Sequence, residues 1–279
     1  MLSEEIINQR RGNITASESH SMMTGWDTPR PTEPFETEIY EWMAHTGRRP
    51  LVGEIKPVME CDVNTKAIEA AWKAYRFDQP TQGLITYAEK LACDELFERD
   101  PNDYDGPGTQ DMINGNEREI DAMIKLSDAT GIDFKRTGED QIHISTDGIG
   151  VTPDGVAYDD LDLIYAGAEA KCRSPLHHAR QLLIVDNATL LDHDFDRYCQ
   201  IQTGYVATGA QEWYSVSYNP CALNKADQFH YCLIERDEAF IKVLMQRAAD
   251  VFKHKQAFIE TISKGRPLRE KQQPQKEAA

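Results

Sequence analysis

The spacing of hydrophobic residues changes character near the middle of the chain. In the first half, apolar residues recur every three or four positions, which predicts helices separated by loops rich in proline and glycine. These helices are expected over residues 4–11, 36–45, 65–75, 84–99 and 112–130. Thr15 and Ser17 both have side chains suited to capping a helix, so a further short helix is expected to begin at one of them.

The second half alternates apolar and polar residues over short runs, a pattern typical of strands. Turn residues divide residues 141–172 into a meander of such runs, and a helix is expected over 194–209. Two further strands, at 212–218 and 229–235, precede a long amphipathic helix at 237–262. This order of elements predicts an α/β fold with a mixed central sheet flanked by helices.

The length and composition indicate one domain. A chain of 279 residues that is 40% hydrophobic can bury one sizeable core. We expect a single domain over residues 1–263, in which residues 25–80 form an inserted, mainly helical subregion. Residues 264–279 are charged and lack apolar anchors, so they are expected to be a disordered tail.

The charge balance limits the class of nucleic-acid-binding protein that the chain can be. A formal net charge of −17 argues against a protein that coats nucleic acid through a broad basic face, so any DNA site must be local. The six cysteines form no CxxC pair, which argues against a structural zinc site or an iron–sulfur cluster. No apolar run has the length of a signal-peptide core or a membrane span, so a cytoplasmic location is expected.

The residues best suited to chemistry lie in two short motifs of the second half. The first is Thr-Pro-Asp-Gly at 152–155, and the second is Glu-Ala-Lys at 169–171. In a strand, residues two positions apart point to the same side, so Glu169 and Lys171 share one face while the alanines between and before them face the packed side. A hairpin between the motifs would bring the Asp154 carboxylate next to that of Glu169.

Two converging carboxylates form a hard oxygen site suited to Mg²⁺, with Mn²⁺ as an alternative. Such a site suits phosphodiester cleavage, because a bound metal lowers the pKa of its water and a second ion assists the leaving oxygen. The Lys171 ammonium would orient the attacking water and neutralise charge on the phosphate. The ExK triplet is a weak signal by itself, since 28% of the chain is charged and Glu54-Ile55-Lys56 repeats it without a preceding Asp-Gly turn.

Several separated stretches of the sequence resemble the lambda-type, or YqaJ-like, phage recombination exonucleases of the PD-(D/E)xK nuclease superfamily. They occur in the order of that family and span nearly the whole chain. They are RRGNITASE at 10–18, NGNERE at 114–119, PDG with EAK, QIQTGYVATGAQEWYSVSYNP at 200–220 and YCLIERDEAF at 231–240. Residues 25–80 and the tail depart from the family pattern.

The resemblance implies a restriction-endonuclease-like core and a set of metal ligands. Asp154, Glu169 and the main-chain carbonyl of Ala170 would hold one or two metal ions, with Lys171 as the catalytic lysine. Glu119 falls where the family has a further acidic ligand, although a helical glutamate can equally be a solvated charge.

The resemblance also implies residues that hold the substrate. Gln200 matches a glutamine that helps to form the active site, and its alternative is a surface glutamine. Arg10, Thr15 and Ser17 match the motif that contacts the terminal 5′ phosphate, and Thr152 falls near the same phosphate. A basic group with hydroxyls is a suitable phosphate site, although Ser17 can also be only a helix cap and Arg10 a solvated arginine.

The function that the resemblance implies is digestion of one strand of linear duplex DNA from its 5′ end. Mononucleotides and a 3′ overhang would result, and a single-strand annealing protein would use the overhang in recombination. Family members form a ring-shaped trimer, and a phage-encoded protein would act in the host cytoplasm. The alternatives are a DNA endonuclease, a RecB-like nuclease module of a larger assembly and a catalytically silent protein that binds DNA ends.

Overall fold

The computed structural model of the chain describes residues 4–24, 26, 80–98, 110–136, 142–172 and 174–264. Of residues 4, 110–117 and 136 it describes only the backbone. The predicted insertion at 25–80, with its two helices and the triplet at Glu54, falls almost entirely outside these ranges, and so does the predicted tail at 264–279. The division into one domain with an insertion therefore stays a prediction.

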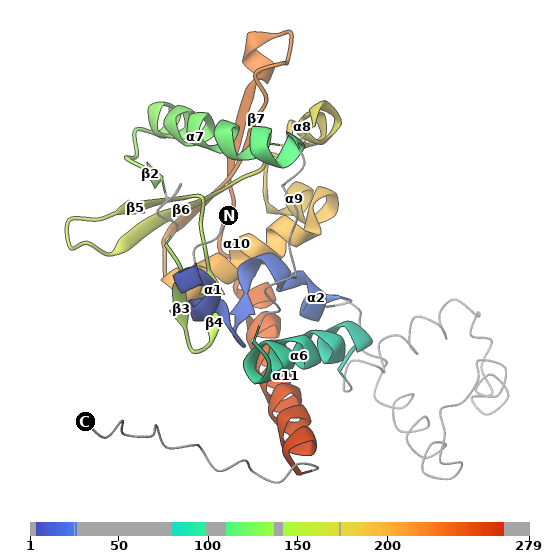
Figure 1. Ribbon diagram of the computed structural model, residues 1–279. Helices are drawn as coiled ribbons and strands as arrows, with labels where there is room; N and C mark the ends of the chain where they lie inside the picture. Colours follow the sequence, from blue (N-terminus) through green and yellow to red (C-terminus); the bar gives the residue numbers. More distant parts are fainter. Residues whose placement is uncertain are drawn as a thin grey trace, which may run out of the picture.

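A five-stranded sheet in the order β2-β5-β6-β7-β8 forms the centre of the fold (Figure 1). Its strands are β2 (Lys135–Arg136), β5 (Gly155–Tyr158), β6 (Ile164–Ala170), β7 (Glu212–Tyr218) and β8 (Phe229–Leu233). Strands β6 and β7 are parallel, whereas the other neighbouring pairs are antiparallel. The predicted mixed central sheet is confirmed.

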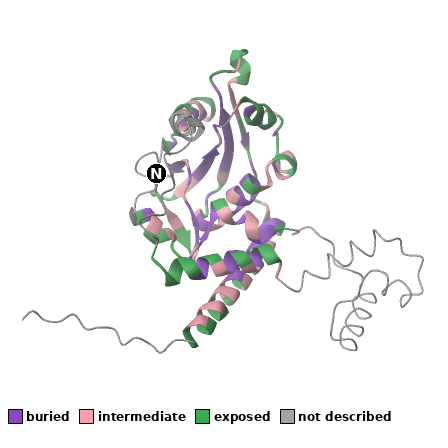
Figure 2. Ribbon diagram, turned by 45° about the vertical axis from the view of Figure 1, so that its right-hand side comes forward, coloured by how far each residue is buried: buried purple, intermediate pink, exposed green. Residues whose placement is uncertain are grey.

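Helices cover both faces of this sheet. Helix α7 (Gln110–Thr130) packs Met123 and Leu126 into one apolar cluster with Val216 of β7. Helix α10 (Phe195–Thr208) belongs to a second cluster, on the other face. Because the sheet lies between the two helices, its inner strands β5, β6 and β7 are coloured mostly as buried in Figure 2.

The contact between α10 and the sheet depends on two glycines around Trp213. The Trp213 side chain is completely buried. A Cβ atom at Gly167 would lie 2.7 Å from its ring, and one at Gly204 would lie 2.3 Å from it. Both distances are shorter than a packed contact allows, so the two glycines make the room in which the indole lies between β6 and α10.

A second, three-stranded sheet joins the N-terminal segment to the middle of the chain. Its order is β1-β4-β3, formed by β1 (Ile14–Thr15), β4 (Ile149–Val151) and β3 (Ile144–Thr146). Strand β1 is parallel to β4, with Thr15 opposite Gly150. The 3₁₀ helix η1 (Ala16–Glu18) follows β1 directly and packs against α10. This pairing positions the N-terminal motif beside the strands that lead into the Pro-Asp-Gly turn.

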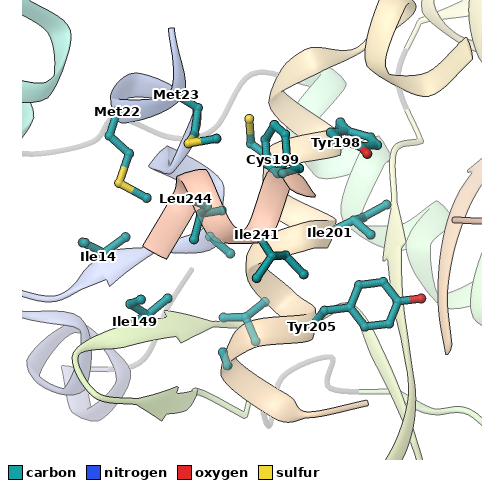
Figure 3. Close-up of a cluster of buried hydrophobic side chains, with 14 of the residues drawn as sticks. Ile14, Met22, Met23, Ile149, Tyr198, Cys199, Ile201, Tyr205, Ile241 and Leu244 are labelled. Atoms are coloured by element: carbon teal, nitrogen blue, oxygen red, sulfur yellow. The ribbon is translucent and has the colours of Figure 1, made fainter. Parts of the chain in front are cut away.

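Helices from both ends of the chain pack together next to this small sheet. Helix α1 (Glu4–Arg10) precedes β1, and α2 (His20–Met23) packs against α6 (Gln82–Leu96) and α11 (Glu238–Lys264). Figure 3 shows the core that these elements share with α10, which includes Ile14, Met22, Met23, Ile149, Ile201, Ile241 and Leu244. Among the described helices, none combines the length and the apolar character that crossing a membrane requires.

The local structure differs from the sequence predictions at the N-terminus. Thr15 and Ser17 do not cap a helix: the Thr15 side chain makes no capping hydrogen bond, and Ser17 lies inside η1. The α-helix that follows, α2, begins only after Ser19. The reason is tertiary, because pairing of β1 with β4 holds the backbone extended up to Thr15.

Two further helices were not expected from the sequence. They are α8 (Pro175–Gln181) and α9 (Asn187–His193), each seven residues long. A helix of two turns carries too few apolar positions for its period to stand out. The α9 start still has a local signal, because Asp186 and Thr189 form a reciprocal capping box.

Candidate active site

The β5–β6 hairpin brings the two predicted carboxylates together. Strands β5 and β6 pair with Gly155 opposite Ala168, which puts Asp154 beside the end of β6 that carries Glu169. The main-chain N–H of Ala170 donates to Asp154 Oδ2 at 2.7 Å, and the N–H of Asp154 donates to the carbonyl of Ala168 at 3.1 Å. These two bonds fix the Asp154 carboxylate against the strand, as the spacing of the motifs predicted.

Lys171 completes this arrangement at the end of β6. Its ammonium Nζ donates to Glu169 Oε1, so the two side chains share one face. The backbone of Lys171 is held on both sides, because its N–H donates to the carbonyl of Val216 at 2.9 Å and its carbonyl accepts from Ser217 Oγ at 3.1 Å. The alternate residues, Ala168 and Ala170, lie in the apolar cluster under α7, as predicted.

The face that carries Glu169 is more enclosed than a charged strand face exposed to solvent would be. The Glu169 side chain is only 2% exposed, whereas Lys171 is 23% exposed. Burial, together with the negative charge of Glu169, raises the pKa of Asp154 well above its ordinary value, and Lys171 opposes that rise. Burial lowers the pKa of Lys171, but the carboxylates of Glu169 and Asp154 outweigh it and raise the pKa overall. The three groups therefore form one coupled unit.

Glu119 of α7 belongs to the same electrostatic unit. Burial raises its pKa from 4.5 to about 7; Lys171 lowers it and Glu169 raises it, so the charges of both residues reach this carboxylate. A carboxyl group with a raised pKa in such a setting is typical of functional sites. Whether Glu119 touches a metal ion stays a prediction.

The donor set fits a divalent metal ion. Oε2 of Glu169 is buried and has no hydrogen-bond partner among the described residues, so a ligand is needed to satisfy it. Asp154 supplies the second carboxylate, beside a cluster whose negative charges are only partly balanced by Lys171. Within the described part of the chain, no three His, Cys, Asp or Glu side chains converge as a metal site. Two carboxylates with water and phosphate oxygens are the usual surroundings of Mg²⁺.

A cavity of about 170 Å³ adjoins this cluster. Its lining comes from segments far apart in the sequence: Arg10, Thr15, Ala16, Ser17, His143, Gly150, Thr152, Asp154, Glu169 and Gln200. All four residues predicted to bind phosphate are thus brought together with both carboxylates and the predicted glutamine. The Arg10 guanidinium donates from Nη2 to Ser17 Oγ at 3.3 Å, so these two residues are also joined to each other.

Gln200 and Gln202 have different surroundings although both lie on α10. Gln200 lines the cavity. Gln202 is buried, donates from Nε2 to the carbonyl of Glu235 at 2.9 Å and accepts from the N–H of Asp237 at 2.9 Å. The second glutamine of the motif therefore has a structural role that the sequence did not indicate.

His143 is a cavity residue that sequence reasoning missed. It lies just before β3, and its Nδ1 shares a hydrogen bond of 3.1 Å with Thr152 Oγ1. No motif contains it. In the sequence, His143 is marked only by its position in the alternating run at 141–145, which predicts a strand and no binding role.

The fold is shared with solved exonuclease structures. The alkaline exonuclease LHK-Exo from Laribacter hongkongensis is 19% identical, with 94% of this chain and 97% of that chain covered and a TM-score of 0.58. LHK-Exo in complex with dAMP gives 20% identity, the same coverages and a TM-score of 0.59. This chain has the exonuclease fold. A phage-related exonuclease from Haemophilus somnus 129PT also shares it, at 12% identity, with 94% of this chain and 100% of that chain covered and a TM-score of 0.53.

The exonuclease fold agrees with the lambda-exonuclease-like, PD-(D/E)xK architecture that the order of the motifs predicted. No protein-family model matches the sequence, and no curated protein matches it significantly. At identities of 12–20%, the structural likeness concerns the fold. The roles of the individual site residues therefore rest on the geometry described above.

The raised pKa of Glu119 leads to a prediction for the metal-free protein. The folded state keeps a proton on Glu119 that the unfolded state releases, so the stability contributed by this group is complete below pH 4.5 and is lost as the pH rises to about 7. Between pH 5 and pH 8 in EDTA, the wild type should lose about 1–2 kcal/mol of unfolding free energy relative to Glu119→Gln, because the amide does not ionise. Urea unfolding at both pH values measures this difference. An equal pH dependence in the two proteins would contradict it.

Proposed function

We propose that this chain is a divalent-metal-dependent exonuclease that digests one strand of linear double-stranded DNA in the 5′-to-3′ direction. The observation that carries the proposal is the shared cavity, in which Arg10, Thr15 and Ser17 lie in the same space as Asp154 and Glu169. One part of the cavity offers a cation and hydroxyls, and the other offers carboxylates. A strand end can place its terminal phosphate on the former and its first internal phosphodiester on the latter.

The size of the cavity agrees with release of mononucleotides. A space of about 170 Å³ is too small for an intact duplex, so only the end of a single strand can enter it. With the terminal phosphate held by Arg10 and the hydroxyls, the bond presented to the carboxylates is the one after the first nucleotide. LHK-Exo has been solved with dAMP, a deoxynucleoside monophosphate, which supports the same product class for this chain.

The residues of the chain divide the chemistry between them. Asp154, Glu169 and the Ala170 carbonyl would hold one or two Mg²⁺ or Mn²⁺ ions, with Glu119 as a further acidic ligand. When bound, such an ion lowers the pKa of a water molecule and stabilises charge on the phosphate. Lys171, held at Glu169, orients the attacking water and neutralises the developing negative charge. Gln200, on the cavity wall, helps to position the strand.

The wider setting follows from the same proposal. A 3′ overhang is the product that a single-strand annealing protein requires, so we assign the enzyme to phage-type recombination in the host cytoplasm. A trimeric ring around the duplex would reconcile the net charge of −17 with DNA binding, because basic residues could then line a central channel.

The proposal is tested with one linear duplex labelled at either end and with a covalently closed circle, in Mg²⁺. We expect nucleotides to be released from the 5′ ends of the linear duplex and the circle to stay intact. Asp154→Asn should abolish this activity, because the amide carries no charge to bind the metal. The amide oxygen can still accept the hydrogen bond from the Ala170 N–H, so the local structure should be kept. Calorimetric titration with Mn²⁺ should show the loss of binding directly.

Other results would identify the alternatives. Cleavage of the closed circle would make the protein an endonuclease. Binding of DNA ends without hydrolysis, in the wild type as in Asp154→Asn, would make it an end-binding protein with no catalytic activity. Release from the 3′ ends would refute the proposed direction.

A further inference from the structure

The phosphate part of the cavity contains two polar atoms that have no partner among the described residues. They are Thr15 Oγ1 and His143 Nε2, and both are buried. Thr15 was expected in this site from the sequence, whereas His143 was not. Buried polar atoms without partners are rare in folded proteins, and two in the wall of one cavity indicate a polar ligand.

The His143 ring is held in place from two sides. Its Nδ1 shares the hydrogen bond with Thr152 Oγ1. On its other side the ring lies against Gly150, where an added Cβ would be only 2.5 Å from both Cε1 and Nε2. Gly150 thus makes the room that the imidazole occupies. A side chain fixed in this way is preorganised for a ligand.

The pair formed by His143 and Thr152 always has a donor to spare. A neutral imidazole carries one N–H and the threonine one O–H, but their mutual hydrogen bond uses only one of these two hydrogens. The other remains on Nε2 or on Oγ1. An imidazolium would leave both of these donors free. The pair therefore suits an acceptor-only ligand, such as a phosphate oxygen.

The charges around His143 also favour an anion. Burial and the nearby Arg10 guanidinium lower the pKa of His143, so its imidazole is mostly neutral at pH 7. A phosphate beside Arg10 would cancel the repulsion. The carboxylates of Asp154 and Glu169 line the same cavity and repel an anion, so the Arg10 guanidinium is needed to attract one to the His143 side.

From this arrangement we infer that His143 binds the 5′-terminal phosphate of the DNA strand and makes the enzyme distinguish phosphorylated from hydroxyl 5′ ends. The inference rests on the proposed exonuclease function, which it deepens by adding a specificity-determining residue outside every motif of the sequence. In this role Nε2 or the Thr152 hydroxyl donates to a phosphate oxygen, and Arg10 supplies the charge.

The test compares His143→Asn with the wild type on two duplexes that differ only in a 5′ phosphate or 5′ hydroxyl. Asparagine places an amide nitrogen near the position of Nδ1, so it can keep the contact with Thr152 while removing Nε2. Binding is measured in EDTA by fluorescence anisotropy, where no hydrolysis occurs. The preference for the phosphorylated end should fall about tenfold, which is the effect of one hydrogen bond to a charged group. With Mg²⁺ present, the KM for phosphorylated ends should rise more than kcat falls.

Two further variants make the test specific. Thr152→Val should reduce the same preference for phosphorylated ends. In the double variant the reduction should be smaller than the sum of the two single reductions in binding free energy, because both residues act through one hydrogen-bonded pair. His193→Asn replaces an exposed histidine of α9 outside the cavity and should keep the wild-type preference.

The outcomes separate this inference from the proposed function. If the wild type prefers phosphorylated ends in EDTA, His143→Asn reduces that preference and neither protein digests DNA in Mg²⁺, the exonuclease proposal fails and the role of His143 in binding stands. If the wild type digests linear DNA, and His143→Asn weakens the binding of phosphorylated and hydroxyl ends equally or leaves both unchanged, the role of His143 is refuted. The exonuclease proposal then stands.

Discussion

Replacing Lys171 with alanine should lower kcat on linear duplex DNA about 1,000-fold, which corresponds to roughly 4 kcal/mol of transition-state stabilisation. The ammonium of Lys171 lies against Glu169 at the end of β6, where it can face both the attacking water and the phosphate. Its charge matters most when negative charge develops on the phosphate, so KM should change much less than kcat. Single-turnover digestion of a 5′-phosphorylated duplex at saturating enzyme measures the chemical step directly.

The control is a lysine with no part in the site. Lys225 is exposed in η3 (Lys225–Asp227), between β7 and β8, and Lys225→Ala should digest DNA like the wild type. Removal of Lys171 also leaves Asp154 and Glu169 without their cation, so thermal unfolding of each variant should confirm that it is folded. A folded Lys171→Ala that keeps more than roughly a tenth of the wild-type kcat would exclude the catalytic role.

The β5–β6 hairpin could be predicted from the sequence because its geometry is local. Asp154 and Glu169 are fifteen positions apart, and a hairpin with a period of two fixes which side chains meet. The pairing of Gly155 with Ala168 realises this geometry. Helix α10 and strand β7 were predictable for the same reason, since each carries a clear period and α10 ends at Gly209, which has the left-handed φ of 69° common at helix ends.

The side of the cavity that holds Arg10 and Ser17 depends on contacts that no local pattern contains. Arg10 and Ser17 reach the cavity because β1 pairs with β4, more than 130 residues later in the chain. The family resemblance named these residues, whereas their residue types alone also allowed Thr15 or Ser17 to be the cap of a helix. The place of Ser17 inside η1 shows that the strand pairing overrides the local preference of serine for capping.

His143 was missed for a related reason. A histidine in an alternating run is most simply a residue of a half-buried strand, and nothing in its neighbourhood matches a motif. The surroundings of His143 are set by two residues. The hydroxyl of Thr152 is hydrogen-bonded to its ring, and Gly150, which has no side chain, leaves room for the ring. Both are visible in the sequence, but their relation to His143 appears only when β3 and β4 are paired.

The largest effect on stability is expected at Trp213, for which Trp213→Ala should reduce the free energy of unfolding by about 3–5 kcal/mol. The indole is completely buried between Gly167 and Gly204, and neither glycine has a side chain that could fill the space. Gly167 lies on β6, two residues before Glu169, so the substitution would open a void beneath the strand that carries Glu169. Urea unfolding followed by circular dichroism measures the loss.

Two variants show that this loss comes from packing. Nε1 of Trp213 has no hydrogen-bond partner within the described residues, so Trp213→Phe removes volume without removing such a bond and should cost clearly less than Trp213→Ala. Leu223→Ala truncates a fully exposed side chain and should leave the unfolding midpoint unchanged. An alanine variant as stable as the wild type would mean that α10 closes onto β6 without the indole. In that case Trp213 would not determine the spacing between helix and sheet on which the positions of Gln200 and Glu169 depend.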